Sequence, residues 1–291
     1  PKQLLVSYAM LLPFLFFFFL MFVMPIFVSL FMSFTNFNML QTPDFVGFSN
    51  YIKLFLDDDV FVTALTNTMV FAFISGPISY VLCFLLAWII SDLGPTLRSI
   101  VTVCFYAPSV AGTGIYVVWR LIFSSDSSGM INGLLMRMGL IDEPILWLTD
   151  PQMSLGIVIL VHIWLSLGAG FLAFIAGLQN IDRSQYEAGA IDGIRNRFQE
   201  FVKITIPAIG PSLLFSAVMQ ISSSFSVGRI CMALTGFPST DYSTSTIVTH
   251  ILDYGTLRYE MGYACAIATV LFLMMLLTNQ VIRRLLRGYT N

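Results

Sequence analysis

The sequence predicts an all-α membrane protein with about six transmembrane helices. Hydrophobic residues make up 57% of the chain and charged residues only 10%, whereas roughly a quarter of the residues in soluble domains are charged. Several apolar stretches are each long enough to cross about 30 Å of hydrocarbon. A soluble core cannot absorb this much apolar surface, but a lipid bilayer can.

The expected spans cover, in chain order, residues of roughly 5–32, 62–90, 99–123, 153–178, 207–234 and 261–282. The first stretch is longer than the apolar core of a signal peptide, so we expect a retained membrane helix. Prolines within the spans are tolerated because neighbouring helices or water can satisfy the freed backbone groups. No repeat or linker divides the chain, so residues 1–291 are expected to form one transmembrane domain.

The basic residues predict the orientation of the chain. If the N-terminus is cytoplasmic, most Lys and Arg residues fall on the inner side, as the positive-inside rule requires. The inner set is Lys2, Arg98, Arg183, Arg195, Arg197, Lys203, Arg283, Arg284 and Arg287, and the outer set is Lys53, Arg120, Arg137, Arg229 and Arg258. Both termini are therefore expected in the cytoplasm.

Two outer loops are of moderate length, and neither is large enough to be a catalytic domain. The second, near residues 124–152, contains the sequence INGLLMRMGLI. Its mixture of apolar and polar residues predicts a short helix that lies at the membrane interface.

The most polar inner segment, about residues 180–206, joins the fourth and fifth spans. Asp182 or Ser184 can cap a helix there, with Glu187 completing a capping box three residues after Ser184. That helix, SQYEAGAIDG, is expected to stop at Gly193, because glycine readily adopts the left-handed conformation that ends helices.

A second amphipathic helix is expected after this corner, over about residues 194–203. Pro207 should then open the fifth span, where its missing N–H is tolerated. Two short helices at the membrane surface would form a knob that can dock on a soluble partner.

This segment resembles the EAA loop of binding-protein-dependent ABC importer permeases. The family pattern has a Glu-Ala-Ala start, a Gly four residues beyond it, and then Ile-x-Leu-Pro. The matching residues are Glu187, Ala188, Asp192, Gly193 and, with Ile for Leu, the sequence ITIP at 204–207, while Gly189 replaces the second Ala. The interval from Gly193 to Ile204 is one residue longer than the family pattern.

Two further segments, LLPFLFFFFLMFVMPIFVSLFMSFTNFN and FVGFSNYIKLF, resemble the carbohydrate branch of that family, the maltose and glycerol-phosphate permease type. The resemblance covers essentially the whole chain. It implies a type I ABC importer permease in the plasma membrane of a bacterium or archaeon. In such permeases the loop at about 180–206 sits in a cleft of the ATPase, which makes Glu187, Ala188, Asp192 and Gly193 the expected coupling residues.

The chain itself has no GxxxxGK[ST] phosphate-binding loop, so we expect no catalytic residue and no bound cofactor in it. The resemblance implies that ATP and Mg²⁺ bind a dimer of separate ABC ATPase subunits. It also implies a second, homologous permease and an extracytoplasmic solute-binding protein. The cysteines and histidines are too widely spaced to predict a metal site, and no basic tract predicts nucleic-acid binding.

Polar residues crowd the middle of the fifth span, where they tend to face a cavity or a partner helix. Gln220, Ser223 and Ser224 lie at helical spacings of three and four residues. A sugar requires neutral donors and acceptors together with aromatic faces, for which Trp164 and Tyr106 are candidates. The serines would equally allow close helix packing, so both interpretations stay open.

Arg229 is a lone charge near the outer end of the fifth span. It either snorkels to the interface or pairs with an acidic residue or an anionic substrate. Its charge makes it a further candidate for the substrate path.

Two other classes of transporter remain as alternatives. An ion- or proton-coupled secondary transporter would need intramembrane acids or broken, repeated helices. An ABC importer for a non-sugar solute, such as an amino acid, a peptide or phosphate, fits the inner loop equally well. A membrane enzyme would need clustered His, Glu or Cys at the membrane surface, and the sequence shows none.

Overall fold

The computed structural model describes residues 2–286, and Arg287, one of the inner basic residues, lies outside this range. Over the described residues the chain is helical, and its one β-type pairing is an isolated bridge between Thr35 and Phe45. Among these residues four helices are long and apolar enough to cross a membrane, and two bent pairs raise the number to six. The predicted all-α class is confirmed.

The chain forms two compact units, and the long helices α4 and α16 contribute to both. Unit 1 extends to Val62 and also includes Ile247–Leu273. Its elements are α1 (Lys2–Phe18), the π turn η1 (Phe19–Val23), α2 (Met24–Met32), α3 (Ser49–Leu56), the start of α4 (Asp59–Ser91), α15 (Ile247–Leu252), the π turn η4 (Asp253–Leu257) and the first half of α16 (Met261–Leu286).

The first span, Met10–Met32, consists of the second half of α1 together with η1 and α2, and it is apolar on all sides. None of its most apolar 18-residue window is buried against the rest of the chain, and side chains such as Phe14 and Phe22 are about two-thirds exposed. Exposure of such a large apolar surface to water is unfavourable. This helix must therefore lie against lipid or another membrane helix.

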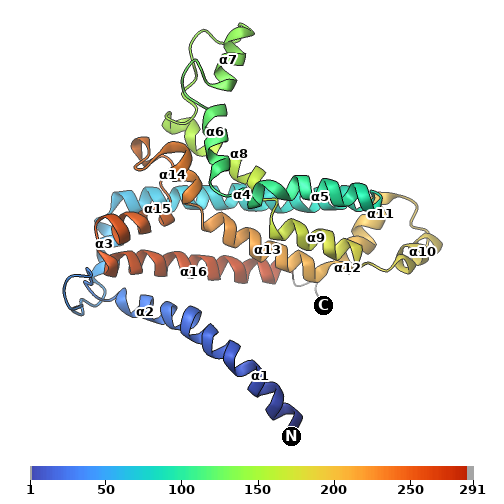
Figure 1. Cartoon of the computed structure of the whole chain (residues 1–291), viewed down its shortest axis with the longest axis horizontal. Coiled ribbons are helices and arrows are strands. Elements are labelled where there is room, and N and C mark those ends of the chain that lie inside the picture. The colour runs from blue at the N-terminus through green and yellow to red at the C-terminus, as the bar shows by residue number, and fades with distance from the viewer. Residues whose placement is uncertain (1, 287–291) are drawn as a thin grey trace. The chain divides into compact units, whose positions relative to one another are not determined.

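Unit 2 covers Thr63–Thr246 and the chain from Met274 onward. Its elements are the remainder of α4, then α5 (Pro95–Val110), α6 (Gly114–Ile122), α7 (Met130–Arg137), α8 (Pro151–Leu165), α9 (Ala169–Gln179), α10 (Arg183–Ile191), α11 (Arg197–Glu200), the π turn η2 (Phe201–Thr205), α12 (Ile206–Ala208), α13 (Gly210–Phe225), α14 (Arg229–Thr235), the 3-10 turn η3 (Thr240–Tyr242) and the end of α16 (Figure 1).

Small residues bring α9 and α13 together within unit 2. A Cβ at Gly177 would lie 2.4 Å from the Ser212 hydroxyl oxygen, so only glycine permits this approach. About two turns earlier on α9, the Gly170 carbonyl oxygen accepts from the Ser216 hydroxyl at 2.7 Å. Close backbone contact and a hydrogen bond of this kind drive helix association where no water is present.

Two of the predicted spans are not single straight helices. The expected span 99–123 is α5 followed by α6, which are bent by 92°. The break lies at residues 111–113, where Gly112 has a φ of +67°. Pro108 in the last turn of α5 also removes a backbone donor there.

The expected span 207–234 is likewise divided. Its first residues belong to the helix Arg197–Ala208, which meets α13 at an angle of 79°. The bend coincides with Gly210-Pro211 at the start of α13, where proline lacks the N–H that a continuous helix needs. The last part of the expected span is the separate helix α14.

Candidate functional site

The loop between the fourth and fifth spans begins with the short helix α10. The Asp182 side chain caps it by accepting from the Ser184 backbone N–H at 3.0 Å. Hydrogen bonds from the Ser184 backbone and hydroxyl lower the pKa of the Asp182 carboxyl. The expected capping box of Ser184 and Glu187 is therefore not formed, because Asp182 occupies the cap and Ser184 already lies in the helix.

The corner after α10 forms as predicted at Gly193, whose φ is +86°. The next helix starts later than expected, at Arg197, and Asn196 caps it by accepting from the Gln199 N–H at 2.8 Å. This helix runs through α11, η2 and α12 to Ala208. Pro207 therefore does not open the fifth span. It lies near the end of the preceding helix, Arg197–Ala208. Within that helix it is an early residue of the short segment α12, where a missing backbone N–H is tolerated.

The second helix of the loop is fixed to the end of α4. The Arg197 guanidinium pairs with the Asp92 carboxylate and lies 5.1 Å from the centre of the Trp88 ring. The Phe201 ring contacts Trp88 at 4.6 Å and stacks on Phe84 at 5.1 Å, measured between ring centres. An ion pair and an aromatic cluster thus attach this helix to α4.

Within the loop, α10 packs on the second helix through Gly189. A Cβ at this position would lie 2.6 Å from Cδ1 of Ile204 and 3.2 Å from Cδ1 of Ile194. The Tyr186 and Thr205 hydroxyls hydrogen-bond at 3.0 Å beside this contact. The residue that departs from the Glu-Ala-Ala pattern is therefore one at which α10 packs tightly on the second helix.

The four expected coupling residues lie on the outside of this loop. Glu187, Ala188, Asp192 and Gly193 are all exposed. Two large apolar side chains, on either side of the corner, are exposed as well: Ile191 at 87% and Phe198 at 71%. Sequence reasoning missed Ile191 and the anchor Arg197, although an isoleucine in an otherwise polar surface helix is a visible signal.

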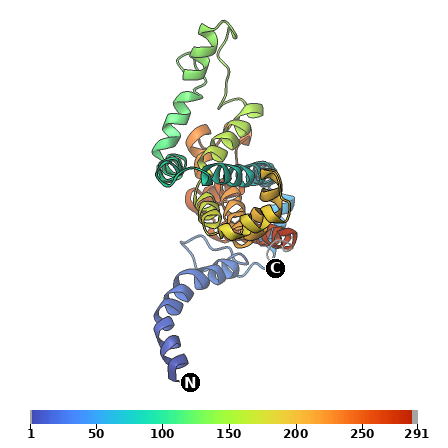
Figure 2. The same cartoon turned by 90° about the vertical axis from the view of Figure 1, so that its right-hand side faces the viewer.

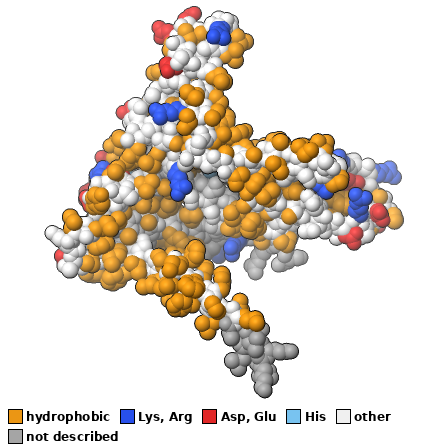
Figure 3. Space-filling view, viewed as in Figure 1, with side chains coloured by type: hydrophobic (Ala, Val, Ile, Leu, Met, Phe, Trp, Pro, Cys, Tyr) orange, Lys and Arg blue, Asp and Glu red, His pale blue; other side chains and the backbone are white. Residues whose placement is uncertain are grey.

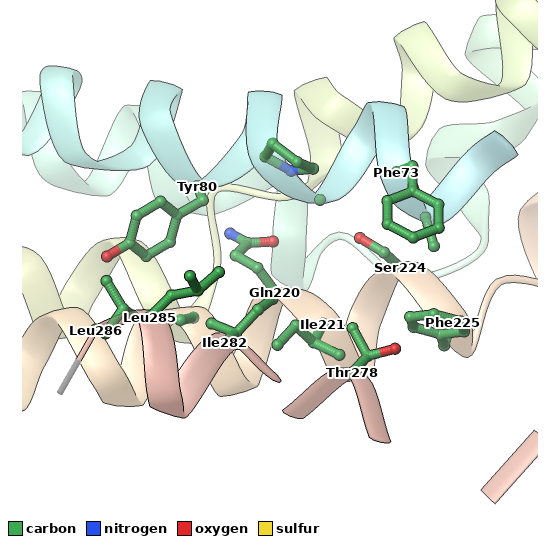
Figure 4. A pocket seen from close by; sticks show the side chains of 14 residues that line it. Phe73, Tyr80, Gln220, Ile221, Ser224, Phe225, Thr278, Ile282, Leu285 and Leu286 are labelled. Atoms are coloured by element: carbon green, nitrogen blue, oxygen red, sulfur yellow. The ribbon is translucent and has the colours of Figure 1, made fainter. Parts of the chain in front are cut away.

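A cavity of about 230 Å³ lies in unit 2 among α4, α13 and the end of α16. Its aromatic walls are Phe73, Tyr80 and Phe225, and its polar groups include Gln220, Ser224 and Thr278 (Figure 4). No Asp, Glu, Lys or Arg is among the described residues that line it. Such a mixture of apolar walls and a few neutral polar groups is typical of sites for uncharged small molecules.

The structure brings together two of the predicted substrate-path residues and separates the others. Gln220 and Ser224 lie one turn apart on α13 and point toward α4 (Figure 4). Ser223, on another face of α13, is exposed and does not line the cavity. Tyr106 on α5 and Trp164 on α8 also lie outside its lining. Sequence reasoning missed Tyr80 and Phe73, since nothing in α4 distinguished them from other aromatic residues of a span.

Gln220 joins three helices while it faces the cavity. Its amide nitrogen donates to the Ser166 carbonyl oxygen and to the Cys83 sulfur, both at 3.2 Å. Ser166 belongs to the break between α8 and α9, and its carbonyl oxygen also accepts from the Gly168 N–H at 2.8 Å. Because these bonds use the nitrogen, the Gln220 oxygen is the atom of this side chain that can accept from a ligand.

Arg229 stands at the first position of α14, and its side chain is exposed. It lies outside the cavity lining.

Unit 1 holds a buried polar cluster that sequence reasoning did not predict. The Asp58 carboxylate accepts from the Tyr263 hydroxyl at 2.7 Å, contacts His250 Nε2 at 2.9 Å, and accepts from the Phe61 N–H at 2.9 Å. Burial opposes ionisation of Asp58, but these hydrogen bonds outweigh it, so its pKa is lowered. The cluster joins the start of α4 to α15 and the start of α16, whose residues His250 and Tyr263 lie 192 and 205 positions after Asp58.

Comparison with known proteins assigns the family. No protein-family model matches the chain. The probable ABC transporter permease protein YesP of Bacillus subtilis (strain 168) is 33% identical over 273 residues, which cover 93% of this chain and 86% of YesP. This chain belongs to the ABC transporter permeases.

Two further relatives place this permease more closely. The lactose transport system permease protein LacF of Rhizobium radiobacter is 31% identical over 236 residues, which cover 79% of the permease and 77% of LacF. The second is a chain in the crystal structure of a bacterial alginate ABC transporter in complex with an alginate pentasaccharide-bound periplasmic protein. It has a TM-score of 0.80 and 26% sequence identity, and the match covers 100% of the permease and 96% of that chain.

These relatives confirm the predicted resemblance to ABC importer permeases of the carbohydrate branch. The permease is accordingly a multi-pass membrane protein. Membership of this family removes the secondary-transporter alternative.

Proposed function

We propose that this permease imports a sugar or oligosaccharide by alternating access. The energy would come from a dimer of separate ABC ATPase subunits that bind ATP and Mg²⁺. A second, homologous permease would complete the path, and an extracytoplasmic solute-binding protein would deliver the substrate. The relatives named for lactose and alginate support a carbohydrate substrate. The location we propose is the plasma membrane of a bacterium or archaeon, with both termini in the cytoplasm.

The observation that carries the proposal is the two-sided loop at about 180–206. One side is attached to α4 by Arg197 and Phe201, while Ile191 and Phe198 remain exposed on the other. A soluble subunit that covers these side chains would gain about 25 cal/mol for each Å² of apolar surface removed from water. Movement of that subunit would then be transmitted to α4 through the Arg197 and Phe201 contacts.

The coupling assignment of Glu187, Ala188, Asp192 and Gly193 follows from the same geometry. These residues lie on the exposed surface beside Ile191, where an ATPase cleft could enclose them. Gly193 would hold the corner that presents α10, because its φ of +86° is unfavourable for any residue with a Cβ.

The cavity of unit 2 is the substrate-path element that we propose for this chain. Sugar rings present C–H faces that pack on aromatic side chains and hydroxyls that bond to neutral polar groups. Phe73 and Tyr80 would supply the aromatic faces, and Gln220 and Ser224 the polar groups. The described lining residues carry no charge, which favours a neutral sugar unit at this position.

The experiment that tests the proposal is mild-detergent purification of the permease from its native membrane, with mass spectrometry of the co-purifying chains. We expect an ABC ATPase and a second permease. In the variant Ile191→Ser the ATPase should be largely lost while the second permease is retained. The matched control is Leu257→Ser, which changes a side chain 62% exposed in η4 of unit 1.

Loss of the ATPase from the control as well would show a general assembly defect. Full retention in Ile191→Ser would mean that this loop is not the docking surface.

A further inference from the structure

A projecting segment of unit 2, residues 114–149, is here called the arm. It contains α6 and α7, and α6 departs from α5 at an angle of 92°. Figures 1 and 2 both show α6 and α7 extending away from α4 and α5. The bent pair of α5 and α6 is apolar enough for a span only as a whole. If α5 is the part that crosses the membrane, α6 at right angles to it runs roughly in the plane of the membrane.

The arm is a defined structure and not a loose loop. Asn132 is fully buried at its centre. Its amide nitrogen donates to the carbonyl oxygens of Ser124, Asp126 and Ile145, at 3.0–3.2 Å. Its oxygen accepts from the Ile145 N–H at 3.2 Å and the Trp147 indole N–H at 2.9 Å. A side chain that satisfies all of its hydrogen-bonding groups fixes the surrounding backbone.

The arm exposes an apolar face that the rest of the described part of unit 2 does not cover. On α7 and its C-cap residue, the exposed side chains of Met130, Leu134 and Met138 recur every four positions, at 68%, 58% and 62% exposure. On α6, Val117 and Leu121 repeat the same spacing at 60% and 64%. Residues four apart share one side of a helix. Figure 3 shows hydrophobic side chains running along the arm.

The aromatic residues of the arm indicate what covers this face. Of the four tryptophans in the chain, two belong to the arm and a third, Trp164, packs against it. The ring centre of Trp164 lies 5.2 Å from that of Trp119, and Phe123 contacts both Trp119 and Trp147. Trp88 lies near the opposite end of unit 2, at the coupling loop. Tryptophans gather at the two membrane–water interfaces, where one end of the ring is apolar and the other is hydrated.

The basic residues of the arm agree with a lipid contact. Arg120 and Arg137 are both exposed. They directly precede Leu121 and Met138, two apolar residues of the exposed face. Long basic side chains at such positions reach from the hydrocarbon edge to the headgroups. The buried centre of a protein interface, in contrast, is depleted of charged residues.

We propose that the arm lies in the membrane–water interface at the end of the spans opposite the coupling loop, with Met130, Leu134 and Met138 inserted into the lipid. The occupant of the apolar face is thus the bilayer and not a second protein. The base of the arm packs on α14, through a core that includes Phe123, Ile230 and Leu234. Insertion in lipid would therefore also hold α14 at a fixed depth beside the end of α13.

The test places a nitroxide spin label at single cysteines in the complete transporter, reconstituted in phosphatidylcholine and phosphatidylglycerol vesicles. The background carries Cys104→Ala and Cys265→Ala, which removes the natural cysteines that are not buried. Leu134→Cys and Met138→Cys report on the apolar face, and either alone suffices if the other variant folds poorly. Asp142→Cys is the control, because this residue is exposed on the same arm.

The measurement is the collision rate of each label with oxygen, which concentrates in lipid, and with a water-soluble nickel complex. We expect oxygen to exceed nickel at Leu134 and Met138, and the reverse at Asp142. Low collision rates with both reagents on the apolar face would mean that a protein covers it and would overturn the proposal. A high nickel rate there would mean that the face is in water, which also overturns it.

Discussion

Arg197 and Asp92 form an ion pair between the inner loop and the end of α4. The two residues are separated by more than a hundred positions, and the same guanidinium also lies over the Trp88 ring. Arg197 is therefore attached to α4 by charge and by an aromatic contact at once.

Replacement of Arg197 by alanine should uncouple ATP hydrolysis from transport without unfolding the permease. The two side chains are about half exposed, and an exposed ion pair or cation–π contact contributes at most about 1 kcal/mol. Folding should thus survive, whereas the loop loses its fixed position on α4. The measurement is transport per ATP hydrolysed in vesicles.

The charge-exchanged double variant, Arg197→Asp with Asp92→Arg, is the control for this effect. It should recover part of the coupling that each single change loses. Equal coupling in wild type and Arg197→Ala would show that the pair is incidental.

Replacement of Gly189 by alanine, the residue of the family pattern, should weaken coupling in this permease. The new Cβ would lie 2.6 Å from Cδ1 of Ile204, so α10 must move or Ile204 must change rotamer. Overpacking of this kind costs about 1–3 kcal/mol. The readout is ATPase stimulation by the loaded binding protein.

The second change Ile204→Val removes the Cδ1 atom and should restore coupling in the Gly189→Ala background. A double variant no better than Gly189→Ala would show that the contact with Ile204 is not the cause.

Replacement of Gln220 by alanine should reduce transport more than it reduces assembly. The change removes the hydrogen bonds to Ser166 and Cys83 and the oxygen that faces the cavity. Loss of a buried hydrogen bond costs about 1–3 kcal/mol, which leaves a folded chain with an altered site. Uptake by vesicles and the yield of the purified complex are compared.

Ser223→Ala is the matched control on the same helix, since Ser223 is exposed and lies outside the cavity lining. It should leave both quantities near wild type. Equal losses of uptake and complex yield in Gln220→Ala would favour a packing role.

The Asp58 cluster should make the stability of unit 1 depend on pH. The folded-state pKa of Asp58 is lowered by its hydrogen bonds to Tyr263, Phe61 and His250, relative to about 3.9 in an unfolded chain. Its contribution is therefore complete above pH of about 4 and is lost as the pH falls through the folded-state value. Thermal unfolding in detergent between pH 7 and pH 3 measures this.

Asp58→Asn should have a lower Tm at pH 7 and a smaller decrease of Tm on acidification than wild type. Asp57→Asn, at an exposed neighbouring position, should behave as wild type. An unchanged acid dependence in Asp58→Asn would refute the assignment.

The fold class and the corner of the loop could be predicted because each depends on local sequence. Span lengths follow from apolar runs, and the turn at Gly193 follows from the glycine itself. The sharp bends could not be placed, because Gly112 and Pro211 each lie within an otherwise continuous apolar run. Hydropathy indicates that a segment is apolar enough for lipid, but it does not show where the helix axis changes direction.

The site was predicted in part, for a comparable reason. The spacing of Gln220 and Ser224 places them on one face of a helix, but the spacing of Ser223 is equally helical. Which face meets α4 is decided by packing, such as the contact of Gly177 with Ser212 on the neighbouring helices. The Asp58, His250 and Tyr263 cluster depends wholly on contacts between distant segments, which one sequence cannot reveal.

The π turn at Phe201–Thr205 explains how this permease accommodates its longer loop. An extra residue in a regular α-helix would rotate all later side chains by about 100°. A π turn instead takes up one additional residue in a single wider turn, so the side chains on each side keep their directions. The Thr205 hydroxyl can thus still bond to the Tyr186 hydroxyl. The additional residue is accommodated without a change in which side of the helix the later side chains occupy. Under the proposed function, a loop with this additional residue would present the same surface to an ATPase as a loop without it.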